Sequence, residues 1–250
     1  MKQVQMTLTE KTPLTADVWQ LRFAGDTSPI THPGQFVNLE LPGRFLRRPI
    51  SVCDWDEETL TLLVRVAGKG TAELCQAQPG TVFDLLSGLG NGFDLDECTG
   101  TPILIGGGIG VPPMLELMKE LSCERTAVLG YRDQQLFLKD EFEACGPVCV
   151  ATEDGSAGTK GNVLDAIREQ GVQGEIIYAC GPTPMLRAVK AYAMEKGIEC
   201  YISLEERMAC GIGACLACVC QSKDVDSHSH VHNKRICKDG PVFAAEEVEV

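Results

Sequence analysis

The sequence contains no uninterrupted apolar run near the roughly 20 residues that a membrane-spanning helix needs. Its first residues, MKQVQMTLTE, also lack the apolar core of a secretory signal. We therefore expect a chain that does not enter a membrane and that works in the cytoplasm.

A surplus of positive charge is also missing. The chain has 22 Lys and Arg against 35 Asp and Glu, which gives a formal net charge of −13. Because such a chain repels polyanions, nucleic acids and anionic membrane surfaces are not expected as partners. An anionic dinucleotide would have to be held by local features, such as a few arginines or a backbone loop.

A third absence concerns catalysis. The sequence shows no convincing acid–base pair and no nucleophile with a partner base, so no catalytic side chain is assigned. Yet 44% hydrophobic and 23% charged residues are typical of a folded globular protein. We expect bound cofactors to supply the difficult chemistry, with the protein supplying position and electrostatics.

Cysteine, in contrast, is abundant. The chain has 13, and five of them lie in the last 41 residues. An odd number in a chain without a secretory signal is not typical of a disulfide framework. The scattered cysteines are interpreted as small hydrophobic side chains in or near packed elements: Cys53, Cys75, Cys98, Cys123, Cys145, Cys149 and Cys200.

The terminal cysteines have the plant-type ferredoxin spacing, C-x4-C-x2-C followed by a distant cysteine, which is typical of a [2Fe–2S] cluster. The predicted ligands are Cys210, Cys215, Cys218 and Cys237, whereas Cys220 is not expected to be one. Two other interpretations stay open. Zinc could be bound by the last three of these ligands together with His228, His230 or His232, or the thiols could be buried and inert.

Residues 1–98 consist of short strand-like runs separated by turn residues such as His32-Pro33-Gly34. Regularly spaced short strands predict a small antiparallel β-barrel, which the residues described below assign as the FAD-binding domain. The expected strands are 3–9, 18–23, 35–41, 49–54, 59–66 and 82–86, with one helix at 72–77.

Residues 99–204 alternate apolar strands with helices. This alternation predicts an α/β domain with a doubly wound, parallel, five-stranded sheet, whose strand ends are where a nicotinamide dinucleotide binds. The expected strands are 103–105, 126–131, 148–152, 175–179 and 200–204, and the helices are 114–121, 139–144, 163–170 and 184–196. Residues 205–250 form the third part, a small cluster-binding segment that is too short to bury a core of its own.

The barrel carries a group of residues suited to FAD. A flavin dinucleotide needs cationic and N–H donors for its pyrophosphate, which Arg48 and Arg65 can provide, and polar partners for the edge of its ring, such as Ser51. The predicted FAD site consists of Arg48, Pro49, Ile50, Ser51, Leu63, Val64, Arg65, Gly70 and Thr71.

Two glycine turns follow strands of the α/β domain. Such turns let the backbone approach a phosphate at a helix N-terminus, although neither has the G-x-G-x-x-G pattern. Because they lie at neighbouring strand ends, a shared cleft for NAD is predicted at Gly106, Gly107, Gly108, Gly110, Cys180, Gly181 and Pro182.

In this order the motifs resemble the ferredoxin–NADP reductase superfamily over the whole chain. The run Arg48-Pro49-Ile50-Ser51 is similar to the R-x-Y-S motif of that family, with isoleucine at the tyrosine position, so the aromatic platform usual there is missing. Within the superfamily the chain looks like the electron-transfer subunits of dihydroorotate dehydrogenase B. The cysteine spacing and the run Cys237-Lys-Asp-Gly-Pro-Val-Phe243 are the most specific points of similarity.

The resemblance implies a partner, an FMN-containing catalytic subunit that oxidises dihydroorotate in pyrimidine (UMP) biosynthesis, with two copies of each subunit. It also implies that electrons pass from that subunit through [2Fe–2S] and FAD to NAD+. Two alternatives share some of these features: a related NAD(P)H:ferredoxin oxidoreductase or sulfide dehydrogenase subunit, and a zinc-stabilised binding module without redox activity.

Overall fold

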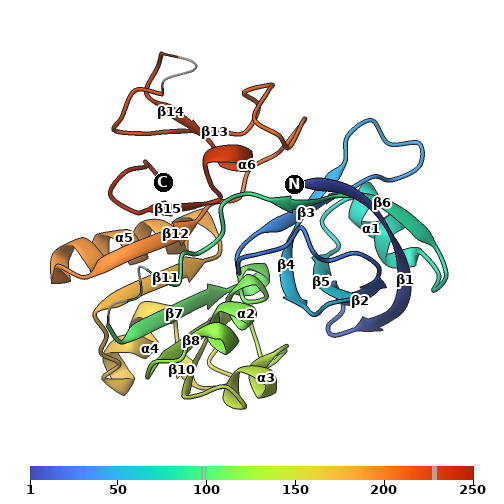
Figure 1. The fold of residues 1–250 in the computed structure, drawn as a ribbon. Helices are drawn as coiled ribbons and strands as arrows, with labels where there is room; N and C mark the ends of the chain where they lie inside the picture. Colours follow the sequence, from blue (N-terminus) through green and yellow to red (C-terminus); the bar gives the residue numbers. More distant parts are fainter. Residues whose placement is uncertain (97, 99, 227–229) are drawn as a thin grey trace.

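The computed structural model describes residues 1–96, 98, 100–226 and 230–250. Figure 1 shows a barrel at the N-terminal end of the chain, an α/β layer beside it, and a small cap formed by the C-terminal segment over both. The N-terminal strand runs along the outside of the barrel, and the C-terminus ends near the cap.

The first part is a closed antiparallel barrel of six strands, as the alternating sequence predicts. The strand order is β1-β2-β5-β4-β3-β6, so hydrogen bonding leaves no open edge. Alternate residues of β6 are buried, which is why an alternating sequence fills the interior. The elements are β1 (Lys2–Pro13), β2 (Val18–Ala24), β3 (Phe36–Leu39), β4 (Arg48–Trp55), β5 (Thr59–Arg65), α1 (Lys69–Gln76) and β6 (Val82–Leu89).

The second part contains the five predicted parallel strands, with helices on both faces. All residues of β7 and β11 are buried, because helices cover both sides. Helices α2 and α3 pack on one face, and α4 and α5 pack on the other. The elements are β7 (Pro102–Gly107), the 3-10 turn η1 (Gly108–Gly110), α2 (Pro113–Glu120), β8 (Thr126–Tyr131), α3 (Lys139–Glu143), β9 (Val148–Thr152), α4 (Val163–Gln170), β11 (Ile176–Cys180), α5 (Thr183–Lys196) and β12 (Glu199–Ser203).

The sheet is larger than the five strands predicted. Its order is β10-β9-β8-β7-β11-β12-β15, with β10 (Thr159–Lys160) at one edge and β15 (Val242–Ala244) at the other. Strand β15 is antiparallel to β12 and comes from the C-terminal segment. The prediction missed both edge strands because two or three residues carry no periodic signal.

The C-terminal segment is anchored to the α/β part. It contains β13 (Val219–Gln221), β14 (Asn233–Arg235) and α6 (Ile236–Asp239) in addition to β15. Cys218, Ile236 and Phe243 belong to the same buried cluster as the inward face of α5. The segment is too small for a core of its own and is stabilised by sharing the hydrophobic core of the α/β part.

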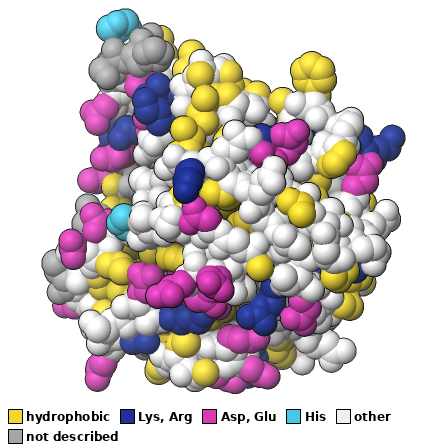
Figure 2. Space-filling view, turned by 45° about the vertical axis from the view of Figure 1, so that its right-hand side comes forward, with side chains coloured by type: hydrophobic (Ala, Val, Ile, Leu, Met, Phe, Trp, Pro, Cys, Tyr) yellow, Lys and Arg dark blue, Asp and Glu magenta, His cyan; other side chains and the backbone are white. Residues whose placement is uncertain are grey.

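Within the described residues, no helix is long and apolar enough to cross a membrane. The face in Figure 2 shows acidic side chains next to basic ones, and no continuous basic surface. This distribution agrees with the net charge of −13, and the face shown offers no continuous basic surface to which a polyanion could bind.

Candidate functional site

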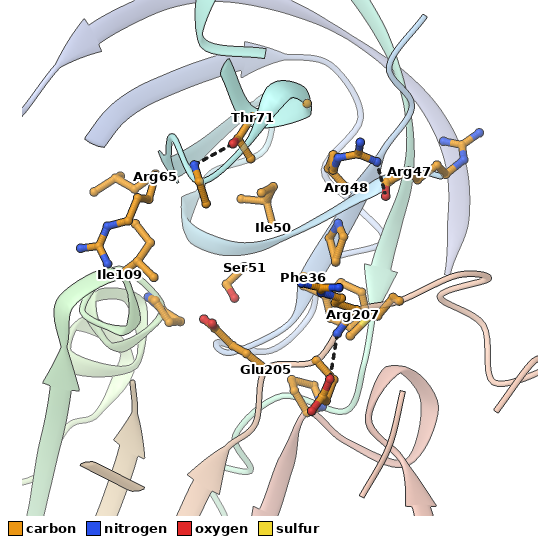
Figure 3. Close-up of a pocket in the computed structure, with 18 of the residues that line it drawn as sticks. Phe36, Arg47, Arg48, Ile50, Ser51, Arg65, Thr71, Ile109, Glu205 and Arg207 are labelled. Atoms are coloured by element: carbon orange, nitrogen blue, oxygen red, sulfur yellow. Dashed lines mark hydrogen bonds between the residues drawn. The ribbon is translucent and has the colours of Figure 1, made fainter. Parts of the chain in front are cut away.

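The main cavity lies where the barrel, the α/β part and the C-terminal segment meet (Figure 3), and its volume is about 980 Å³. Most of the predicted FAD residues line it, which brings strand β4, the end of β5 and the start of α1 around one space. Those residues are Arg48, Pro49, Ile50, Ser51, Leu63, Arg65, Gly70 and Thr71. The size and the mixed apolar and cationic lining fit a flavin dinucleotide.

The two adjacent arginines have different surroundings. Arg47 forms ion pairs of 2.6 Å with both Glu40 and Asp84. Arg48 donates to the main-chain carbonyls of Leu46 and Arg47, and Figure 3 shows the two side chains leaving the strand in different directions. Arg48 is therefore the arginine whose charge is available to an anionic ligand.

The start of α1 is built around this arginine. A Cβ atom added to Gly70 would overlap the Arg48 guanidinium, so the glycine lets that side chain lie against the helix in its present position. Thr71 Oγ1 accepts hydrogen bonds from the backbone N–H of Ala67 (2.9 Å) and Gly68 (3.2 Å). The hydroxyl thus holds the turn that leads into the helix and presents its N-terminal end to the cavity.

Strand β5 divides its residues between the cavity and the barrel interior. Leu63 and Arg65 line the cavity, whereas Val64 is fully buried in the barrel core. Strand alternation explains this result, because neighbouring residues point to opposite faces. Val64 is thus placed away from the cavity that it was predicted to line, while Arg65 Nε lies 3.5 Å from the Asp17 carboxylate.

The apolar wall supplies an aromatic ring that the motif itself lacks. Ile50 lines the cavity from β4, and Phe36 lines it from β3. The two strands are paired, and Phe36 is the register partner of Ser51. An aromatic side chain therefore borders the cavity one strand away from the position where the motif usually carries it.

The third wall comes from residues 203–208, which the sequence did not single out. Glu205 and Arg207 extend into the cavity between β12 and the first cluster cysteine. In Figure 3 the Glu205 carboxylate points toward Ser51 across the cavity. Burial raises the pKa of this carboxyl, while the Arg65 guanidinium acts in the opposite direction. A carboxyl group facing a hydroxyl in a cofactor cavity can accept or hold a proton there.

A second, smaller cavity of about 230 Å³ follows the carboxyl ends of β7, β8 and β9. Gly107, Gly108 and Pro182 line it, together with Arg65, which also borders the main cavity. The sheet order reverses direction between β7 and β11, and such a switch point is where doubly wound sheets bind nucleotides. This groove is therefore the natural place for a nicotinamide dinucleotide.

The remaining glycines of the two turns pack against each other. A Cβ atom on Gly110 would overlap the Cys180 carbonyl, and one on Gly181 would lie 3.2 Å from Gly107 Cα. Gly106 lies against Val111 in the same way. Cys180 is buried, and its burial raises the pKa of its thiol. These residues shape the groove through close backbone contact but do not line it.

The cluster loop directs backbone N–H groups at its sulfur atoms. Cys210 Sγ accepts from the N–H of Ile212 (3.4 Å) and Ala214 (3.3 Å), and Cys237 Sγ accepts from Gly213 (3.1 Å). Gly211 and Gly213 have φ angles of 70° and 82°, which glycine adopts without strain. Such N–H donors stabilise the negative charge of thiolates that ligate iron.

The electrostatics of Cys210 agree with this arrangement. Partial burial works to raise the pKa of its thiol, but hydrogen bonds from the Ile212 N–H, the Cys215 side chain and the Ala214 N–H outweigh that effect and lower the pKa to about 6. A thiol with this pKa is largely thiolate at neutral pH, the form that binds metal.

Two other candidate ligands have backbone carbonyls as their contacts. Cys220 Sγ donates to the Lys234 carbonyl at 3.6 Å. His232 Nδ1 is 2.8 Å from the Lys223 carbonyl, and His228 lies outside the described residues. No three Cys, His, Asp or Glu side chains of the described chain are grouped as ligands of one metal ion.

Two parts of the chain match known protein families. Residues 205–249 match the iron-sulfur cluster binding domain of dihydroorotate dehydrogenase B. Residues 104–191 match the oxidoreductase NAD-binding domain. The first match covers the cysteine loop and the second covers both glycine turns, so each falls on a site described above.

Solved structures share the fold. A chain from the structure of the NADH-dependent reduced ferredoxin-NADP oxidoreductase is 31% identical, with a TM-score of 0.87, and the match covers 98% of this chain and 89% of that one. The flavohemoglobin of Malassezia yamatoensis, solved with bound FAD and heme, is similar in fold alone, with 18% identity, a TM-score of 0.68 and coverage of 79% and 58%.

Curated relatives match along the full length. A protein of Geobacillus sp. (strain WCH70) is 44% identical over 99% of both chains, and one of Listeria monocytogenes serotype 4a is 43% identical over 100% of both. Both are named electron transfer subunit of dihydroorotate dehydrogenase B (NAD(+)). The barrel, the nicotinamide groove and the cysteine loop thus occur together in one chain, and these relatives match it over its whole length. The chain belongs to the family of electron-transfer subunits of NAD-dependent dihydroorotate dehydrogenase B.

Proposed function

We propose that this chain holds FAD in the main cavity, a [2Fe–2S] cluster on the cysteine loop and NAD(H) in the groove. It carries electrons from an FMN-containing dihydroorotate dehydrogenase catalytic subunit to NAD+ in pyrimidine biosynthesis. The observation that supports this most is the third wall of the main cavity. Residues 203–208 line that cavity and lead directly to Cys210, so the flavin cavity and the cluster loop are adjacent.

In this proposal Arg48 and the N-terminal turn of α1 hold the FAD pyrophosphate, through charge-assisted hydrogen bonds and backbone N–H groups. Ser51 and Glu205 face the reactive part of the cavity and hold a proton there. Arg65, which borders both cavities, joins the flavin site to the nicotinamide groove. When bound, FAD supplies the exchange between a hydride of the nicotinamide and the single electrons that an iron–sulfur cluster carries.

The groove holds the dinucleotide with Gly107, Gly108 and Pro182, whose backbone can approach a phosphate closely. Gly106, Gly110, Cys180 and Gly181 belong to this site as the packing beneath it. Cys210, Cys215, Cys218 and Cys237 are the proposed cluster ligands, and Cys220 is not one.

The cluster loop is the proposed docking surface for the catalytic subunit. Cys215 is exposed, so the cluster would lie next to solvent in the isolated chain. Ile212, Leu216 and Val219 around it are exposed large hydrophobic side chains, with 45%, 41% and 37% of their surface accessible. Figure 2 shows hydrophobic side chains along the upper edge of the molecule, where Figure 1 draws both the C-terminal segment and a loop of the barrel. An exposed apolar group at a redox centre is typical of a protein interface.

We further propose an assembly with two copies of each subunit, as the resemblance implies. We also propose that the protein works in the cytoplasm. All 13 cysteines are free thiols, which suits a reducing compartment.

The experiment compares three samples for NADH formation from dihydroorotate: the chain alone, the chain with its catalytic subunit, and the pair carrying Cys237→Ser. The chain alone should oxidise NADH with ferricyanide and should fail with dihydroorotate, because in this proposal the FMN and the dihydroorotate site belong to the catalytic subunit. The pair should turn over, and the Cys237→Ser pair should lose most of that turnover. Turnover of dihydroorotate by the chain alone would refute the proposal, and full turnover by the variant pair would mean that the cluster is structural.

A second candidate is a subunit of an NAD(P)H:ferredoxin oxidoreductase. The observation that favours it is the match of 31% identity and a TM-score of 0.87 to a structure of that kind. This candidate predicts reduction of ferredoxin by NADPH without any dihydroorotate-oxidising partner. A visible spectrum before and after dithionite excludes the zinc module, since flavin and [2Fe–2S] absorb visible light and zinc does not.

A further inference from the structure

Two cysteines outside the redox sites lie in contact. Cys98 belongs to the connection from β6 to β7, which joins the barrel to the α/β part, and Cys123 belongs to the turn between α2 and β8. Their Sγ atoms are 3.8 Å apart, although the residues are 25 positions apart in the sequence. Outside the cluster loop, this is the one sulfur–sulfur contact among the hydrogen bonds of the described residues.

The geometry allows the two sulfurs to bond. A disulfide has an S–S distance of about 2.05 Å, so the atoms must approach by roughly 1.8 Å. Neither cysteine lies in a helix or strand, and both are only half-buried. Rotation of the two cysteine side chains can therefore shorten the distance without disturbing the sheet or the barrel.

Backbone hydrogen bonds hold both cysteines next to each other. The Arg125 guanidinium donates to the Cys123 carbonyl at 2.9 Å and to the Cys145 carbonyl at 3.0 Å. It thus fixes the backbone of Cys123 beside the loop that follows α3. Cys98 makes a long contact of 3.8 Å from Sγ to the Gly100 carbonyl. The Cys98 N–H also donates to the Leu95 carbonyl at 3.1 Å, so both cysteines have an anchored backbone.

We propose that Cys98 and Cys123 are a reversible thiol–disulfide modification site that ties the interdomain connection to the end of helix α2. The oxidant is a low-molecular-weight disulfide such as oxidised glutathione. A Cys123 thiolate attacks one of its sulfurs and releases one glutathione thiolate; the Cys98 sulfur then attacks the mixed disulfide and releases the second. Two protein thiols lose their protons and two electrons, and one small disulfide becomes two thiols.

The order of attack follows from the environment of Cys98. Burial and the adjacent Cys123 thiol raise the pKa of the Cys98 thiol. A thiol of this kind is a poor first nucleophile in solution, but an intramolecular attack at contact distance needs only a small thiolate fraction.

The cross-link has a structural consequence. Helix α2 borders the main cavity with Pro112 and Pro113, and its Lys119 forms an ion pair of 2.6 Å with Asp54 of the barrel. A bond from the interdomain connection to the end of this helix closes a loop of about 26 residues. It restricts the unfolded chain and both sides of the domain boundary.

The test uses the full-length holoprotein, incubated with oxidised glutathione or with dithiothreitol, alkylated and digested with trypsin without reduction. The expected product is peptide 120–125, which contains Cys123, linked to peptide 70–119, which contains Cys75 and Cys98. The link should be retained in Cys75→Ser and Cys145→Ser and lost in Cys98→Ser and Cys123→Ser. The oxidised wild type should also melt about 5 °C higher than its reduced form, a shift that Cys98→Ser abolishes.

Two results would overturn the proposal. One is glutathione attached to Cys123 without a peptide cross-link. The other is a cross-link that persists in Cys98→Ser. The native protein should lose two thiols while its mass shows no added glutathione, an answer that does not depend on any variant folding well.

Discussion

Arg48 provides the sharpest test of the flavin site. Its guanidinium lies against Gly70 at the start of α1 and forms hydrogen bonds only to nearby carbonyls among the described contacts. A hydrogen bond between charged groups contributes about 1.5–3 kcal/mol. Since about 1.4 kcal/mol corresponds to tenfold in affinity, Arg48→Ala should weaken FAD binding by roughly 10- to 150-fold.

Arg47→Ala is the matched control. It removes the same side chain one position earlier, but there the lost partners are Glu40 and Asp84. Arg47→Ala should lower the free energy of unfolding by about 1 kcal/mol and keep the FAD dissociation constant within about twofold of the wild-type value. Arg48→Lys keeps the charge but loses the planar fork, so its affinity should lie between those of the wild type and the alanine variant.

A second perturbation reaches the same side chain from the opposite side. Gly70→Ala places a methyl group where the Arg48 guanidinium lies, so it should weaken FAD binding without removing any charge. The assay is titration of FAD into deflavinated protein, followed by flavin fluorescence, with iron content as the measure of correct folding. Equal loss of affinity in the Arg47 and Arg48 variants would refute this account of the site.

Three other predictions concern the cluster, the nicotinamide groove and the domain contact. Cys218→Ser should lose most bound iron and sulfide while Cys220→Ser keeps both, as measured by iron and sulfide analysis; the opposite pattern would exclude the ligand assignment. Asp133 and Glu153 line the groove beside β8 and β9, where acidic side chains would bind the adenosine ribose hydroxyls of NADH and repel the 2′-phosphate of NADPH. Glu153→Arg should therefore raise the ratio of kcat/KM for NADPH over NADH by about tenfold or more in the ferricyanide assay. An unchanged ratio would mean that the ribose does not bind next to Glu153. Burial raises the pKa of the Glu116 carboxyl from 4.5 to about 7. Because the folded-state pKa is higher than the unfolded-state pKa, the free energy of unfolding should fall by about 1–3 kcal/mol as pH rises from 4.5 to 7. In urea unfolding, Glu116→Gln should show a smaller change over this pH range than the wild type.

The sequence predicted those parts of the fold whose pattern is periodic. The alternation in β6 and the continuous apolar run of β7 each have one structural interpretation, and both elements form as expected. Strands β10 and β15 were missed because pairing partners, and not periodicity, make two or three residues into a strand. Even so, the run that contains Val242 and Phe243 was recognised as specific from resemblance alone.

The candidate site was predicted unevenly for a related reason. Arg48, Ser51 and Arg65 line the cavity because they belong to local motifs that can be recognised in sequence. The side chain of Val64, which was also predicted, lies in the barrel core instead, as strand alternation requires. Glu205 was missed because it enters the cavity from a different part of the chain, and nothing in its neighbourhood indicates this. Long-range contacts of this kind are fixed only by the packing of the domains.

The attachment of the cluster segment explains how so short a piece of chain can carry electrons. A cluster loop linked by a flexible tether would vary its distance to the flavin cavity, and electron transfer depends steeply on distance. Here β15 pairs with β12, and β12 runs directly into residues 203–208 of the cavity wall. Asn91, in the connection after barrel strand β6, also accepts from the N–H of Val242 at 3.1 Å and donates to its carbonyl at 2.8 Å. One three-residue strand therefore joins the cluster segment to both other parts, and its backbone hydrogen bonds fix the separation of the two redox sites independently of the side chains that hold either cofactor.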